Sequence, residues 1–183
     1  PMNEEVRMAT LDMERGELLV PPKKVAGSYE GVNSYADWSP DGKILGFTSW
    51  RPGSGALCFL SQETGEQRDI FPSKAARYIR LNWHPDGRSV VVVGARGILR
   101  IDVASGQATP VVTEGAGFHS PRCTPDGMFV YYEEDTSWED KVFRIMRVDL
   151  GSKERKEIYR STQQIIRMDI SPDGRSLAFL EPA

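Results

Sequence analysis

The residue types that most often carry catalysis are present, but their spacing does not fit the known catalytic patterns. No G-x-S-x-G nucleophile elbow occurs, and Ser54 lies in a Gly-rich connection between strands. The phosphate-loop pattern and the H-E-x-x-H zinc pattern are also absent. Of the two histidines, His84 occupies a turn position and His119 begins a strand. We therefore predict no catalytic residues, no metal, no cofactor and no enzymatic activity within this sequence.

One acidic segment is a candidate contact site for a partner. Residues 133–141 read EEDTSWEDK, and Trp138 stands among five carboxylates. We expect this segment to form a loop that joins two strands. A tryptophan on such a loop could anchor a protein partner, because aromatic side chains carry much of the energy of interfaces. A weak divalent-cation site, or a solvated loop with Trp138 folded back on the sheet, are the alternatives.

A short motif that ends in Pro-Asp-Gly occurs four times, with spacings of 45, 40 and 47 residues between its aspartates. Proline presets φ for a turn, aspartate bonds to backbone amides, and glycine accepts positive φ. The motif therefore predicts a tight turn and explains the aspartates without calcium, since no D-x-D-x-D-G loop is present. The turn residues are Pro40, Asp41, Gly42, Pro85, Asp86, Gly87, Pro125, Asp126, Gly127, Pro172, Asp173 and Gly174.

A second repeated signal lies between these turns. Apolar-Asp-apolar triplets followed by glycine begin at Leu11, Ile101 and Val148, and a looser copy begins at Leu60. Each is typical of a third strand, a turn and a fourth strand, so a repeat of 40–47 residues contains four strands. No segment shows a sustained helical period. We predict an all-β propeller of four-stranded antiparallel blades, in which residues 26–72, 73–113 and 114–160 form three complete blades. Residues 1–25 and 161–183 form complementary half blades, which would make four blades if they closed together.

The Ser/Thr-Pro-Asp-Gly repeat, an apolar strand and an Asp…Gly turn together resemble the TolB-like repeat, a relative of the WD-type propeller repeat. This repeat is found in TolB, in the propellers that cover prolyl-oligopeptidase-type peptidases and the tricorn protease, and in many uncharacterised bacterial proteins. The resemblance covers nearly the whole chain. Two departures are His84 in place of Ser or Thr, and a blade count below the six or more that are usual.

This resemblance implies a non-catalytic module for protein or peptide binding or scaffolding. The alternative is an accessory propeller excised from a larger multidomain protein, such as a prolyl-oligopeptidase-type peptidase or a kinase-like receptor. The resemblance also favours a periplasmic or extracytoplasmic location, although the chain contains no signal peptide. Because the chain opens on Pro1 and not on methionine, we expect it to be processed or excised from a longer protein.

The mouth of the propeller channel is the predicted binding surface. First strands line the channel and bring arginine and aromatic residues to one face, which suits an acidic peptide or a carboxylate. The alternative is that these arginines only solvate the rim. The candidate partner-binding residues are Tyr35, Trp50, Arg80, His119, Trp138 and Arg167.

Net charge and the length of apolar runs exclude some classes of partner. The net charge of −3 argues against nucleic acid, which needs a clustered basic surface, and no apolar run approaches the ~20 residues that span a bilayer. Cys58 and Cys123 are expected to be small buried hydrophobes. An open arc of blades would expose two sheet edges. We therefore expect the chain to close on itself or to associate through these edges, with a slight preference for an assembly or a larger parent protein.

Four polar residues stand at equivalent positions of the repeats, two residues before each Ser/Thr/His of the turn motif. Polar groups close to the propeller axis need hydrogen-bond partners. We interpret these residues as structural links between blades that take no part in catalysis. They are Asp37, Asn82, Arg122 and Asp169.

Overall fold

The computed structural model describes residues 4–25, 29–73, 77–135 and 142–182. These residues form strands and turns, with no helix among them, and hence no helix that could cross a membrane. The strands group into five antiparallel sheets. The strands are β1 (Arg7–Asp12), β2 (Glu17–Lys24), β3 (Val32–Trp38), β4 (Ile44–Arg51), β5 (Ser54–Ser61), β6 (Gln67–Ile70), β7 (Ile79–Trp83), β8 (Ser89–Gly94), β9 (Gly97–Asp102), β10 (Ala108–Val112), β11 (Phe118–Cys123), β12 (Phe129–Asp135), β13 (Phe143–Asp149), β14 (Arg155–Ser161), β15 (Ile166–Ile170) and β16 (Leu177–Leu180).

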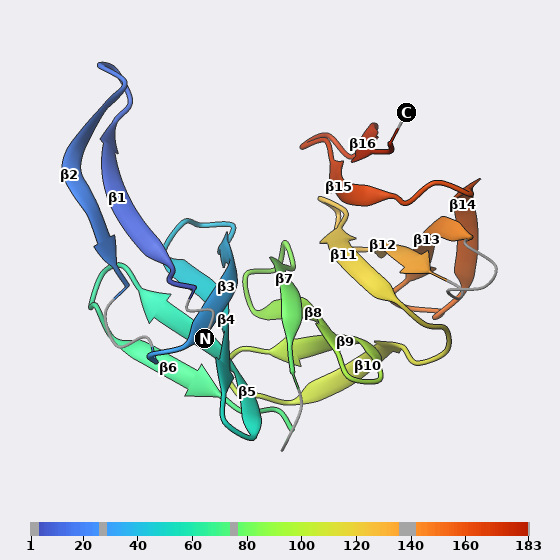
Figure 1. Cartoon of the computed structure of the whole chain (residues 1–183), viewed down its shortest axis with the longest axis horizontal. Helices are drawn as coiled ribbons and strands as arrows, with labels where there is room; N and C mark the ends of the chain where they lie inside the picture. Colours follow the sequence, from blue (N-terminus) through green and yellow to red (C-terminus); the bar gives the residue numbers. More distant parts are fainter. Residues whose placement is uncertain (1–3, 26–28, 74–76, 136–141, 183) are drawn as a thin grey trace.

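Three of the sheets are complete four-stranded blades, and each follows chain order. Blade I contains β3–β6, blade II contains β7–β10 and blade III contains β11–β14. The first half blade is the hairpin β1–β2, and the second half blade is the hairpin β15–β16. The sheets are arranged in an arc, with the first strand of each blade on its concave side (Figure 1). The predicted all-β propeller architecture is confirmed.

Apolar side chains fill the space between successive sheets. The alternation of side chains along β8 shows how this works, because Val90 and Val92 pack toward blade I while Val91 and Val93 pack toward blade III. A strand of this kind is buried on both faces and reads as a continuous apolar run. The core is therefore a series of layers between blades, as in other proteins built from stacked repeats.

The Pro-Asp-Gly segments form tight turns between the first and second strands of each complete blade and of the second half blade. In blade I, the Ser39 hydroxyl donates to Asp41 (2.6 Å), and Asp41 accepts from the Lys43 amide (3.1 Å). Gly42 closes the turn at φ 71°. In blade II, His84 replaces the serine: its Nδ1 accepts from the Asp86 amide, and its Nε2 lies 3.1 Å from the Gly127 carbonyl of blade III.

The four equivalent polar residues near the axis link the first strands of neighbouring sheets. Asp37 accepts hydrogen bonds from the Asn82 side chain (3.0 Å) and from the Trp83 amide (2.9 Å). Asn82 in turn accepts from the Cys123 amide (3.0 Å), and Arg122 lies 3.4 Å from Asp169. Their interpretation as links between blades agrees with this network.

The two half blades stand at opposite ends of the arc (Figure 1). Each is a separate two-stranded sheet, and no β-ladder joins them within the described part of the chain. The count of four blades, which requires the halves to pair, therefore stays a prediction. Outer strand β2 contains two adjacent prolines, which is tolerated because a fourth strand needs no further ladder on its outer side.

Candidate binding site on the concave face

The first strands of all three blades and of the second half blade contain the same backbone irregularity. Each strand has one non-glycine residue with positive φ, five positions before the turn proline: Tyr35 (54°), Arg80 (59°), Ser120 (42°) and Arg167 (51°). The pairing register shifts beside each of them, as expected for β-bulges. The left-handed region costs L-residues about 1–2 kcal/mol. Residues held in such conformations cluster at ligand-binding sites, and bulges re-aim side chains.

Two of these bulge residues contact each other across the interface between blades I and II. The guanidinium of Arg80 lies over the ring of Tyr35, 5.1 Å from its centroid, in a cation–π arrangement. Among the residues that the structure describes, Nε of Arg80 is buried and has no hydrogen-bond partner. The guanidinium of Arg80 is therefore held against Tyr35 with one donor, Nε, that no described residue satisfies.

Carboxylates from β12 approach the same face. Glu133 pairs directly with His119 of β11, and its side chain is only 4% exposed. Burial raises the pKa of Glu133, while Ser120, His119 and Arg80 act in the opposite direction. Within the described residues, its Oε1 has no hydrogen-bond partner. Two positions along, Asp135 lies 3.2 Å from Nε2 of His119.

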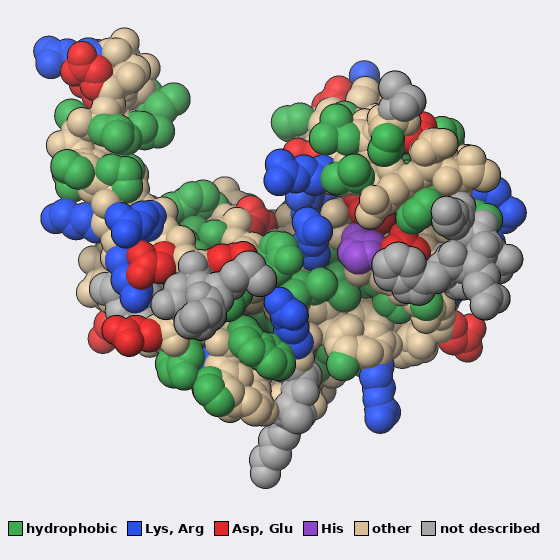
Figure 2. Space-filling view, in the orientation of Figure 1, with side chains coloured by type: hydrophobic (Ala, Val, Ile, Leu, Met, Phe, Trp, Pro, Cys, Tyr) green, Lys and Arg blue, Asp and Glu red, His purple; other side chains and the backbone are tan. Residues whose placement is uncertain are grey.

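We call this group the axis cluster: Tyr35, Arg80, His119, Ser120, Glu133 and Asp135. It combines a guanidinium and an imidazole with two carboxylates, so it suits a ligand that offers both an acceptor and a donor. The described residues contain no group of three or more His, Cys, Asp or Glu side chains that could hold a metal. Figure 2 shows basic side chains and a histidine lining the hollow of the arc.

The remaining predicted site residues are placed differently. Trp50 is the penultimate residue of β4 and lies beneath Arg77, whose guanidinium is 5.3 Å from the indole centroid. Arg167 occupies the exposed bulge of β15. Trp138 lies outside the described residues. The neighbouring Arg51 pairs with Asp69 and stacks on Phe71, so its charge is already neutralised within blade I.

The predicted acidic loop is partly wrong. Glu133, Glu134 and Asp135 belong to strand β12, and the first two are buried. Glu134 accepts two hydrogen bonds from Arg155, at 2.9 and 3.0 Å. Sequence reasoning grouped these carboxylates with the loop that follows, because a run of acidic residues usually marks a solvated segment. The missing information was tertiary, since Glu133 lies opposite His119 of β11 and Glu134 binds the Arg155 side chain of β14.

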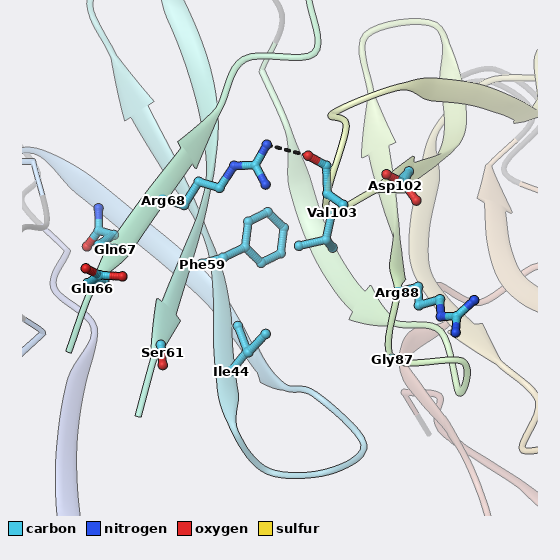
Figure 3. A pocket seen from close by; sticks show the side chains of 11 residues that line it. Ile44, Phe59, Ser61, Glu66, Gln67, Arg68, Gly87, Arg88, Asp102 and Val103 are labelled. Atoms are coloured by element: carbon cyan, nitrogen blue, oxygen red, sulfur yellow. Dashed lines mark hydrogen bonds between the residues drawn. The ribbon is translucent and has the colours of Figure 1, made fainter. Parts of the chain in front are cut away.

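A groove lies between blades I and II, away from the axis cluster and beside the Pro-Asp-Gly turn of blade II. Its volume is about 830 Å³. Figure 3 shows Phe59 and Val103 facing each other across the groove, with Ile44 nearby, while Arg68 donates to the Ala104 carbonyl and bridges the two blades. The groove is lined in part by apolar side chains, and its described lining residues contain no cluster of unsatisfied polar groups. We therefore take the axis cluster as the candidate site.

Comparisons with known proteins agree with the fold. No protein-family model matches the chain. The uncharacterized protein Atu1656 of Agrobacterium fabrum is 28% identical over 140 residues, which cover 73% of this chain and 47% of that protein. The chain thus spans about half the length of the curated relative it matches.

Two solved structures are similar in fold at low sequence identity. TolB from Acinetobacter baumannii matches with a TM-score of 0.69 at 17% identity, over 91% of this chain and 41% of TolB. A prolyl endopeptidase structure matches with a TM-score of 0.62 at 19% identity, over 81% of this chain and 26% of the peptidase. These similarities establish the fold only. The chain therefore has the β-propeller fold of the TolB-like type.

Proposed function

We propose that this chain is a non-catalytic propeller module that binds a protein or peptide partner on the concave face of the arc. The observation that carries this proposal is the row of strained non-glycine residues in the first strands. Arg80 and Tyr35 in this row contact each other, and Arg80 keeps a buried donor without a partner. A purely structural bulge would be made more cheaply with glycine, which adopts positive φ without strain.

The chemistry of the face favours a peptide that presents a carboxylate. Arg80 offers a guanidinium that is partly withdrawn from water, and Arg167 offers a second one on the next exposed bulge. Arginine binds carboxylates through paired hydrogen bonds. The carboxylates of Glu133 and Asp135 would repel an anion that came too close, so the ligand must also offer a donor, as a peptide backbone does.

The test is fluorescence anisotropy with a labelled peptide that alternates glutamate and glycine. We expect Arg80→Ala to weaken binding at least tenfold, because it leaves the bound carboxylate without its partner, and Arg167→Ala to weaken it less. Arg15→Ala is the matched control, since Arg15 lies on the exposed turn of the first half blade with a side chain 77% exposed. Equal affinity of the wild type and the Arg80 variant would rule out the concave face as the site.

A second candidate is a propeller domain that serves a catalytic domain on the same polypeptide. The fold similarity to a prolyl endopeptidase, of which this chain covers 26%, favours it. The two candidates are separated by the coding sequence that flanks this segment in the source genome. A flanking hydrolase domain with a nucleophile elbow would support the second candidate, and its absence would leave the binding module.

A further inference from the structure

The groove between blades I and II has an apolar floor. The ring of Phe59 lies at its base, and the half-buried side chains of Ile44 and Val103 flank that ring (Figure 3). The space between them has a volume of about 830 Å³. Both walls of the groove belong to complete blades, so the half blades contribute nothing to it.

Arg68 of β6 lies across this groove. Its Nη2 donates to the Ala104 carbonyl of blade II, which holds the guanidinium beside the ring of Phe59 (Figure 3). Arg68 is an exposed residue, and it forms no ion pair with any residue that the structure describes. The remaining donors of Arg68 are therefore open to an acceptor from outside. Because the side chain is already anchored, a ligand that binds it loses little further side-chain entropy.

The acidic residues that border the groove are directed elsewhere. Asp102 accepts hydrogen bonds from the amide and the hydroxyl of Ser105, at 2.7 and 2.6 Å, and thereby stabilises its own turn. Glu66 lies on the side of Phe59 that is remote from Val103 (Figure 3). The charge beside the apolar floor is thus positive, which suits a ligand with a carboxylate next to an apolar group.

The other two complete blades do not repeat this combination. Phe59 lies opposite Arg68 on the third and fourth strands of blade I. Arg100 occupies the position of Phe59 in blade II, and Arg147 occupies it in blade III. Arg100 is itself paired with Asp86, at 2.7 Å. An aromatic floor with an anchored arginine is therefore a property of this groove, and the blade fold does not require it.

We propose that the groove between blades I and II binds the C-terminus of a partner polypeptide whose last residue is apolar. The apolar side chain lies on Phe59, between Ile44 and Val103, and the terminal carboxylate accepts hydrogen bonds from Arg68. A C-terminal residue fits because its carboxylate is close to its own side chain, as the guanidinium is close to the ring. A floor of three side chains matches one or two apolar residues and is too short for the chain of a lipid. This site is separate from the axis cluster and does not rest on the proposed function.

The experiment is an NMR titration of the isotope-labelled full chain with the probe peptide acetyl-Gly-Gly-Leu. We expect the amide signals of Phe59, Arg68 and Val103 to shift and to saturate with the free acid. The same peptide with an amidated C-terminus should bind about tenfold more weakly, because its uncharged end forms weaker hydrogen bonds with Arg68. Acetyl-Gly-Gly-Gly should also bind more weakly, because it leaves the apolar floor uncovered.

Two variants separate the charge of Arg68 from its structural role. Arg68→Gln keeps a donor for the Ala104 carbonyl but removes the charge, so it should weaken binding of the free acid about tenfold. Arg88→Gln is the matched control, because Arg88 borders the same groove with its guanidinium directed away from Phe59 (Figure 3). It should bind the probe as the wild type does. The dispersion of each spectrum shows whether the variant is folded.

Several results would overturn the proposal. Equal affinity for the acid and the amide would do so, as would wild-type binding by a folded Arg68→Gln variant or the absence of saturable shifts. Shifts confined to the first strands would place the probe on the concave face instead of in the groove. Displacement of the peptide by an equal concentration of decanoate would assign the groove to a fatty acid, which also contradicts a polypeptide C-terminus as its occupant.

Discussion

At the scale of single residues, the concave face combines strain with incomplete hydrogen bonding. Glu133 is a carboxylate in a strand, 4% exposed, with one oxygen lacking a hydrogen-bond partner among the described residues. A buried polar group without a partner costs free energy, and a buried charge costs more. Such a residue is retained at the expense of stability, which is consistent with a role in binding.

This cost predicts a pH-dependent effect of Glu133→Gln. Burial raises the pKa of Glu133 in the folded protein, so the folded state holds its proton more tightly than the unfolded state. The stabilising contribution of the protonated form is complete below the ordinary pKa of a glutamate and is lost as the pH rises through the raised value. We therefore expect the variant to gain melting temperature over the wild type at pH 7–8, and this gain to shrink toward pH 4.

Thermal unfolding monitored by circular dichroism across this pH range measures the difference. Glu63→Gln is the control, because Glu63 is exposed on a turn of blade I. A difference between Glu133→Gln and the wild type that stays constant from pH 4 to pH 8 would contradict this account of Glu133.

At the scale of elements, the first strands are held in register by side chains that reach the next blade. Asp37 is the clearest case, since it accepts bonds from both the side chain of Asn82 and the amide of Trp83. We expect Asp37→Ala to lower the free energy of unfolding by about 1.5–3 kcal/mol, the range for hydrogen bonds to charged groups. Chemical denaturation with urea measures this loss.

The sequence supplies a matched control for this substitution. Asn82 occupies the same position in blade II and performs the same task through its amide oxygen, which accepts from the Cys123 amide. Asp37→Asn should therefore restore most of the stability that Asp37→Ala loses. If the alanine variant were as stable as the wild type, the links near the axis would not contribute to the cohesion of the blades.

At the scale of the whole molecule, stability is distributed in layers and decreases toward the ends. Strand β8 is packed on both faces by the apolar clusters of two interfaces. Strand β2 is an outermost strand in an end sheet, and all of its residues are exposed. Local opening is easiest where few apolar contacts must be broken.

Hydrogen exchange followed by mass spectrometry should reveal this gradient. We expect the amides of β8 to be the last to exchange and those of β2 to be among the first. Uniform protection of β2 and β8 would show that the chain unfolds as one unit without a layered order.

Sequence reasoning predicted the blades because their determinants are local. The turn motif before Ile44, Ser89, Met128 and Arg175 depends on the φ preferences of proline and glycine, and the valine run of β8 reports burial on both faces. The order of strands in the repeat also placed Tyr35, Arg80 and Arg167 on one face, at the mouth of the channel. These properties follow from chain periodicity and turn chemistry alone.

Only the tertiary structure decided which of these residues meet and which edges stay open. Glu133 belongs to the axis cluster because strand β12 continues past the apolar residues by which the sequence indicates a strand. The environment of the Glu133 carboxyl group depends on side chains from blades II and III. The separation of the half blades depends on the angle at which successive sheets pack, since that angle accumulates along the arc. The spacing of the repeats does not determine this angle, because the angle is set by how side chains fit between the sheets.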